Sequence, residues 1–65
     1  MRVKINGADE NIPDGSDINA LLQSRALKPD KVAVELNRRL VRGAKYDTIL
    51  KEDDELEIVT FVGGG

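Results

Sequence analysis

The chain has 65 residues, a length that allows one domain with one modest hydrophobic core. Charged residues make up 34% of the chain and the net charge is -2, a balance typical of a soluble surface and not of a nucleic-acid-binding protein. Cysteine and histidine are both absent, so the chain has no thiolate nucleophile, no soft metal ligand and no imidazole base. We therefore expect a protein that is not an enzyme, with no catalytic residue, no bound metal and no bound cofactor. The lack of a membrane-spanning run or signal peptide predicts a cytoplasmic protein that binds no membrane.

A β-hairpin is predicted at the start of the chain. Val3 and Ile5 alternate with polar residues, which is strand periodicity. Asn6-Gly7 follows, and this dipeptide is favoured in the type I′ turns that join hairpin strands. Residues 10–12 are predicted as the second strand, so the hairpin would occupy residues 1–12.

A helix is predicted next. Asp17 is the expected N-cap, because the apolar pattern starts on the following residue and a carboxylate suits a helix N-terminus. Apolar residues recur at helical spacing from Ile18 to Leu27. Lys28-Pro29-Asp30 is expected to end the helix, since the residue before a proline disfavours the α conformation. A helix this short is unstable alone, so we expect it to pack on a sheet.

Three further strands are predicted in the rest of the chain: residues 31–37, residues 40–41 and residues 56–62. In the first of them Val32, Val34 and Leu36 share one face. Asn37-Arg38-Arg39 is predicted as a turn. Residues 44–50 are expected to form an irregular or 3₁₀ segment that crosses an end of the sheet.

This order of elements predicts an α+β fold of the β-grasp (ubiquitin-like) type, with a mixed sheet of four to five strands and one helix packed on one face. The strand after the helix can return by a right-handed crossover. The final strand is expected in the centre of the sheet, beside the first. Residues 1–62 would form this domain and residues 63–65 a flexible tail.

The final strand divides its side chains between two faces. One face is predicted to carry Leu56, Ile58, Thr60 and Val62, and the other Glu57, Val59 and Phe61. If Leu56 and Ile58 face the core, Val59 and Phe61 form an apolar pair on the outer face. That pair is either partly covered by a loop or the crossing segment, or forms a docking patch for a partner, and the two interpretations are compatible. We predict partner docking by Glu57, Val59, Phe61 and Val62.

Two charged clusters lie in the second half of the chain. The basic one contains Arg38, Arg39, Arg42 and Lys45, and the acidic one contains Glu52, Asp53, Asp54, Glu55 and Glu57. Each is either a solvated face that keeps the domain soluble or a surface that steers it to a partner. The sequence leaves both interpretations open.

Three glycines, Gly63, Gly64 and Gly65, follow the final strand. Glycine lacks a Cβ, so such a segment fits a narrow channel where side chains would clash. The alternative is a plain flexible linker. We expect the Gly65 carboxylate to be presented to a partner, as the working end of a carrier protein.

The whole chain resembles the ThiS family, the ubiquitin-like sulfur carriers of thiazole formation in thiamine biosynthesis. The resemblance is carried by four stretches: Val3-Lys4-Ile5-Asn6-Gly7, Asp17-Ile18-Asn19-Ala20-Leu21-Leu22, Val32-Ala33-Val34-Glu35-Leu36-Asn37, and residues 54–65. Helix starts in the family often have threonine where this chain has Asp17, another capping residue. Members end in a Gly-Gly pair, which here is Gly64-Gly65.

The resemblance implies a chemistry for the tail. A ubiquitin-activating-type (ThiF-like) adenylyltransferase, using ATP and magnesium, would adenylylate Gly65. A persulfide sulfur donor would then convert the end to a thiocarboxylate. Thiazole synthase (ThiG-like) would receive the sulfur during thiazole phosphate formation. Gly63 and Gly64 would let the end of the chain thread into the active sites of both enzymes. The carrier itself would bind neither ATP nor metal.

Three other functions remain open at the level of sequence. The small subunit of molybdopterin synthase has the same fold and tail chemistry, but such chains are usually longer. A ubiquitin-like protein modifier would instead join Gly65 to lysines. A non-catalytic interaction module would have no use for Gly64 and Gly65.

Overall fold

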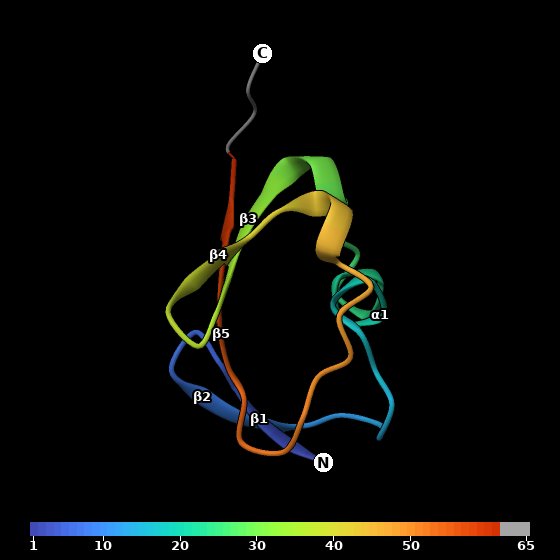
Figure 1. Cartoon of the computed structure of the whole chain (residues 1–65), viewed down its shortest axis with the longest axis vertical. Coiled ribbons are helices and arrows are strands. Elements are labelled where there is room, and N and C mark those ends of the chain that lie inside the picture. Colours follow the sequence, from blue (N-terminus) through green and yellow to red (C-terminus); the bar gives the residue numbers. More distant parts are fainter. Residues whose placement is uncertain (62–65) are drawn as a thin grey trace.

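A five-stranded mixed sheet with one helix on one face forms the fold in the computed structural model, which describes residues 1–61 (Figure 1). The elements in chain order are β1 (Arg2–Ile5), β2 (Ala8–Asn11), α1 (Ile18–Ser24), the 3₁₀ turn η1 (Pro29–Lys31), β3 (Val32–Leu36), β4 (Arg39–Val41), the 3₁₀ turn η2 (Gly43–Lys45) and β5 (Glu55–Thr60). The strand order is β2-β1-β5-β3-β4. β5 is central, parallel to β1 and antiparallel to β3. The predicted α+β, β-grasp arrangement with a central final strand is confirmed.

The first hairpin turns where the sequence predicts, at Asn6 and Gly7. Their φ angles of 50° and 84° are both positive, as a type I′ turn requires. The second strand was misplaced, because it starts at Ala8 and not at Glu10. The two-residue turn fixes the register by pairing Ile5 with Ala8, so pairing begins directly after Gly7.

The helix begins as predicted and ends earlier than predicted. The Asp17 carboxylate accepts a hydrogen bond of 2.7 Å from the Ala20 N–H, which confirms the N-cap. The last helical residue is Ser24, so the prediction of a helix to Leu27 was wrong. Ala26 takes the left-handed conformation with φ 57°, and the Leu27 N–H bonds back to the Leu22 carbonyl at 2.9 Å. This is a Schellman motif with alanine in place of the usual glycine, and it ends the helix before Pro29 can.

The core lies between α1 and the inner face of the sheet. Its buried side chains are Val3, Ile5, Ile18, Leu21, Leu22, Val32, Val34, Tyr46, Leu50, Leu56 and Ile58. The alternation predicted for β3 and β5 is therefore confirmed at every buried position of these strands. In residues 1–61 no buried side-chain polar atom lacks a hydrogen-bond partner.

The segment after β4 closes the inner side of the molecule. It starts with η2 and then runs beside α1 (Figure 1), where the Asn19 N–H donates to the Tyr46 carbonyl and the Leu50 N–H to the Ser16 carbonyl. Tyr46 and Leu50 are both buried against the core. This segment therefore covers the helix side of the sheet and leaves the outer face to solvent.

None of the helices in residues 1–61 has the length and the apolar character of a membrane-spanning segment. Residues 62–65 lie outside the described part of the chain. The predicted roles of Val62, Gly63, Gly64 and Gly65, and the predicted domain boundary after residue 62, therefore stay predictions.

Candidate partner-docking site around β5

Two asparagine side chains hold the central strand β5. The Asn6 amide spans Ile58, with its Oδ1 accepting from the Ile58 N–H at 2.7 Å and its Nδ2 donating to the Ile58 carbonyl at 3.2 Å. Asn37 bonds β5 near its start. Its side-chain Oδ1 accepts from the Glu55 N–H at 3.0 Å, and its backbone N–H donates to the Glu55 carbonyl at 2.8 Å. Each asparagine has a φ near 50° and opens a hairpin turn. The direction of β5 is thus fixed from both of its neighbours.

The outer face of β5 carries exposed apolar side chains, as the alternation predicted. Val59 is 60% exposed and Phe61 is 55% exposed, whereas Leu56 and Ile58 on the same stretch are buried. Leu40 of β4 adds a third apolar side chain to this face, 68% exposed. Both side chains of the pair are thus more than half exposed, and the interpretation that a loop or the crossing segment partly covers them stays a prediction. An exposed aromatic and two aliphatic side chains on one sheet face are typical of a protein-docking surface.

Carboxylates border the apolar patch formed by Val59, Phe61 and Leu40, on the side of the hairpin turns. Glu57 lies directly opposite Glu35 in the β3–β5 ladder, and Glu55 is the next outward residue on β5. Lys4 lies opposite Glu55 on β1. Within residues 1–61 neither member of the Glu35–Glu57 pair forms an ion pair. Like charges placed opposite each other destabilise a sheet, so this pair is suited to a basic side chain brought by a partner.

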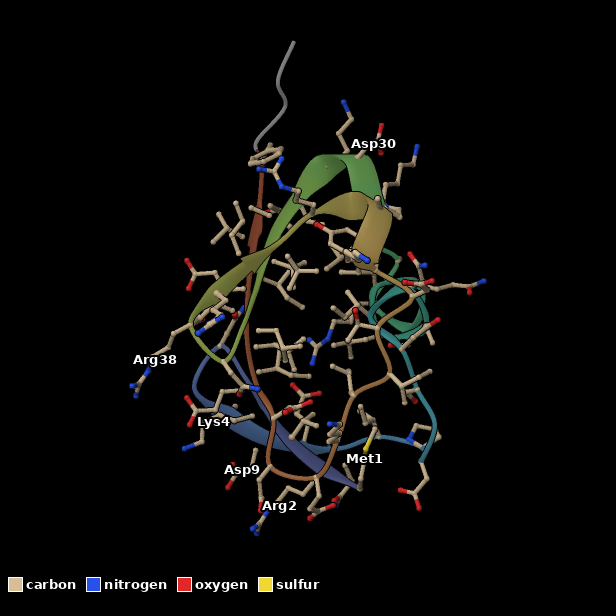
Figure 2. The ribbon with its side chains drawn as sticks, in the orientation of Figure 1. Met1, Arg2, Lys4, Asp9, Asp30 and Arg38 are labelled. Carbon is tan, nitrogen blue, oxygen red and sulfur yellow. The ribbon has the colours of Figure 1, made fainter. Side chains whose placement is uncertain are left out.

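A shallow hollow lies at the foot of these carboxylates. It is lined by Lys4, Gly7, Glu35, Arg38, Glu55, Leu56 and Glu57. Figure 2 shows Lys4 and Arg38 extending away from the body on the same side of the molecule. The hollow is lined by both basic and acidic side chains. Such a mixed lining suits polar side chains of another protein better than a single free anion or cation.

Most of the acidic cluster in the turn before β5 has a structural role. The Glu52 carboxylate accepts from the Arg2 N–H at 3.0 Å, and Asp53 forms an ion pair of 3.5 Å with the Arg2 guanidinium. Asp54 accepts from the Lys51 N–H at 2.8 Å and from the Asn37 amide at 3.0 Å. These bonds hold the turn that starts β5. Glu55 and Glu57 are the members of the cluster that face outward beside the patch.

The predicted basic cluster is spread over three elements. Arg38 lies in the β3–β4 turn with φ 72°, Arg39 starts β4, and Lys45 ends η2. Arg38 is at the far end of its hairpin from Asp30, which lies near the end of β5 (Figure 2). The steering interpretation for this cluster stays a prediction.

The sequence located Glu57, Val59 and Phe61 on one exposed face, and the structure brings them together there. It missed Glu35 and Leu40, which reach the same face from β3 and β4. The alternation along each strand places Glu35 and Leu40 on the face opposite to that of Val34 and Val41, so the sequence could have assigned their face. Only the strand order shows that they are neighbours. Among residues 1–61 no group of acidic side chains is arranged to hold a metal ion.

Comparison with known proteins gives relatives over the full chain. A thiazole synthase of Magnetococcus marinus is 41% identical over 66 residues, which cover 100% of this chain and 20% of that protein. A protein of Pyropia yezoensis described as uncharacterized protein ycf40 is 36% identical over 66 residues, covering 100% of this chain and 93% of that protein. The chain thus spans about a fifth of the length of the thiazole synthases that it matches.

A solved structure and a family model agree with these relatives. The crystal structure of the thiamine biosynthesis protein ThiS from Geobacter metallireducens superimposes with a TM-score of 0.82 at 26% identity, covering 100% of both chains. The model of the ThiS family matches residues 3–65, a range that includes the three glycines. The chain belongs to the ThiS family.

Proposed function

We propose that this chain is a sulfur carrier of thiamine biosynthesis, which carries sulfur as a thiocarboxylate on Gly65 and delivers it to thiazole synthase. The observation that carries the proposal is the match of the ThiS family model from residue 3 to residue 65, over both the β-grasp domain and the glycines that follow it. The names of the relatives support the acceptor, since the two thiazole synthases are 41% and 39% identical over the full chain.

The proposed chemistry starts at the Gly65 carboxylate, which is a poor electrophile. An activating enzyme of the ubiquitin-activating type would join it to the AMP part of ATP, releasing pyrophosphate, with magnesium bound by that enzyme. The terminal sulfur of a persulfide then attacks the acyl carbon and expels AMP. A thiol cleaves the remaining S–S bond, which leaves the thiocarboxylate on Gly65 and a disulfide on the donor. The carrier contributes the acyl group and performs no catalysis.

The structure of residues 1–61 supports a presenting role for β5. This strand is central, it is fixed by Asn6 and Asn37, and it is the last strand before the glycines in the sequence. Its end lies at the opposite end of the molecule from the N-terminus (Figure 1). Val59 and Phe61 on its outer face would dock the body of the carrier, so that Gly63 and Gly64 enter the partner's active site in a set direction.

Intact mass spectrometry tests the proposal. The protein is incubated with its activating enzyme, ATP, magnesium and a persulfide donor, and we expect the mass gain of one oxygen replaced by sulfur. The control is the same protein without Gly64 and Gly65, which should melt at the same temperature, because residues 1–61 hold the core, and should gain nothing. Conjugates of higher mass instead of a thiocarboxylate would mean that the protein is a modifier and would overturn the proposal.

A further inference from the structure

The two edges of β5 end at different residues. On the β3 side pairing continues to the last described residue, since the Phe61 N–H donates to the Lys31 carbonyl at 2.9 Å. On the β1 side the ladder covers only two pairs, Lys4 with Glu55 and Ile5 with Leu56, before β1 turns away. Within residues 1–61, one edge of β5 therefore has no paired strand beyond the first hairpin turn.

The alternation of backbone groups shows which amide faces this open edge. Odd-numbered residues bond toward β3, as the bonds of Glu55 in β5 and of Phe61 directly after it show. Even-numbered residues bond toward β1, where the Asn6 N–H donates to the Leu56 carbonyl at 2.9 Å. Thr60 is even-numbered and exposed, so its N–H and C=O point to the side that β1 has left.

Asn6 marks the place where the sheet stops on this side. Its side-chain amide satisfies both backbone groups of Ile58, as a further residue of β1 would. The next backbone groups in phase are those of Thr60. Beside the turn, a Cβ placed on Gly7 would meet no atom within 4 Å, so the turn leaves open space next to it. An extended segment that continued the line of β1 would meet the backbone groups of Thr60 next.

The outer edges of the sheet are less suited to such pairing. β2 carries Asp9 and Glu10, and the three-residue β4 carries Arg39, and charges on short edge strands discourage the addition of another strand. The edge at Thr60 is flanked by uncharged Val59 and Phe61. Thr60 also lies only five residues before Gly65, the proposed working end, in the sequence.

We propose that thiazole synthase adds an extended backbone segment to β5 at Thr60, with one of its carbonyls accepting from the Thr60 N–H and one of its N–H groups donating to the Thr60 carbonyl. The side chains of that segment on the outer face would be apolar, since they would lie beside Val59 and Phe61. The inference rests on the proposed function. In this inference thiazole synthase recognises the carrier by hydrogen bonds to its backbone. These bonds would also orient the end of β5 relative to thiazole synthase.

Hydrogen exchange read at single residues tests this pairing. In the free protein the Thr60 amide should exchange fast and the Val59 amide slowly, because Val59 pairs with Ala33. In the complex with thiazole synthase the Thr60 amide should become protected. Fast exchange at Thr60 in a complex that has formed would overturn the inference. Protection of the Thr60 amide only by the activating enzyme would mean that this enzyme occupies the edge. Protection that depends only on carrier concentration would mean that a second copy of the carrier occupies it. Either result would overturn the inference as well.

Substitution at Thr60 gives a second test. Thr60→Pro removes the N–H without breaking a bond to β3, and should weaken binding to thiazole synthase about tenfold, the effect expected for one lost backbone hydrogen bond. Thr60→Val keeps the N–H and should bind as the wild type does. If proline lowers the melting temperature, an ester in place of the amide between Val59 and Thr60 removes the same donor with less effect on the backbone. Wild-type affinity of the ester variant would overturn the inference.

The two proposals fail separately. Formation of the thiocarboxylate on Gly65 is read by mass and does not need the Thr60 edge. A Thr60→Pro protein that gains sulfur and binds thiazole synthase normally would overturn the edge pairing and leave the carrier function standing. A wild-type protein that gains no sulfur from an active partner would overturn the carrier function.

Discussion

Single residues in unusual backbone conformations account for local features that the sequence pattern did not reveal. Ala26 ends the helix in the left-handed region at φ 57°, where the Cβ of an L-residue is costly. Asn6 and Asn37 lie in the same region and use their amides to bond β5. In the first case the conformation is a cost to stability, and in the other two it places a side chain that stabilises the sheet.

Replacing Ala26 by glycine should stabilise the protein by about 1 kcal/mol, because glycine adopts positive φ without strain. The matched control is Ala20→Gly inside α1, which should destabilise by about 1 kcal/mol because glycine is a poor helix former. Urea unfolding of both variants measures the two changes. The same sign of change in both would contradict the Schellman ending of the helix.

Replacing Asn6 by glycine should destabilise the protein by about 1–3 kcal/mol, because glycine keeps the turn while the Ile58 N–H and C=O lose their partner. Arg38→Gly is the control, since Arg38 has φ 72° in the other turn and extends into solvent (Figure 2). Thermal unfolding should show no loss for Arg38→Gly. A stability of Asn6→Gly equal to the wild type would mean that water replaces the amide at no cost.

At the scale of elements, β5 combines two roles on its two faces. Leu56 and Ile58 anchor it in the core, while Val59 and Phe61 stay exposed. A strand built in this way can lose an outward side chain without losing the fold. The separation of the two faces makes the docking role testable apart from stability.

Phe61→Ala should weaken the affinity for a partner enzyme by about 1–3 kcal/mol and change the unfolding free energy by less than about 0.5 kcal/mol. Ile58→Ala on the opposite face of the same strand should instead cost about 2–5 kcal/mol of stability. Calorimetric titration and urea unfolding separate the two effects. Unchanged affinity of Phe61→Ala for both partner enzymes would remove Phe61 from the docking surface.

The sequence predicted elements well where a local cause decides them. Asp17 caps its helix, Asn6-Gly7 turns its hairpin, and alternation assigns the faces of β3 and β5. It failed at the start of β2, where Ala8 and Asp9 have weak strand preferences and only the turn register places them. It also missed the end of α1, because alanine at a left-handed position carries no sequence signal.

At the scale of the whole molecule, charge is arranged unevenly over the outer face. The net charge is only -2, yet Glu35 and Glu57 lie opposite each other beside the apolar patch. This pairing could not be predicted, since it depends on the register between two strands that are 18 residues or more apart in the chain. We expect the Glu35–Glu57 pair to affect the approach of a charged partner more than the stability of the fold.

Glu57→Gln should slow association with a basic partner surface at low salt and leave the rate unchanged at high salt, because screening removes the steering. It should also stabilise the fold by about 0.2–1 kcal/mol by relieving the repulsion with Glu35. Glu52→Gln makes the same charge change in the turn before β5 and should slow association less. Stopped-flow kinetics at two salt concentrations decides, and equal rates for wild type and Glu57→Gln at low salt would contradict steering by this face.

The central claim is that sulfur travels on Gly65 to thiazole synthase, and the most direct test follows the mass of the carrier through one cycle. Carrier charged by its activating enzyme is purified and mixed with thiazole synthase and the other substrates of thiazole formation. We predict that the thiocarboxylate mass returns to that of the carboxylate as thiazole phosphate forms in equal amount. A thiocarboxylate that persists while thiazole synthase is active with another sulfur source would contradict the account.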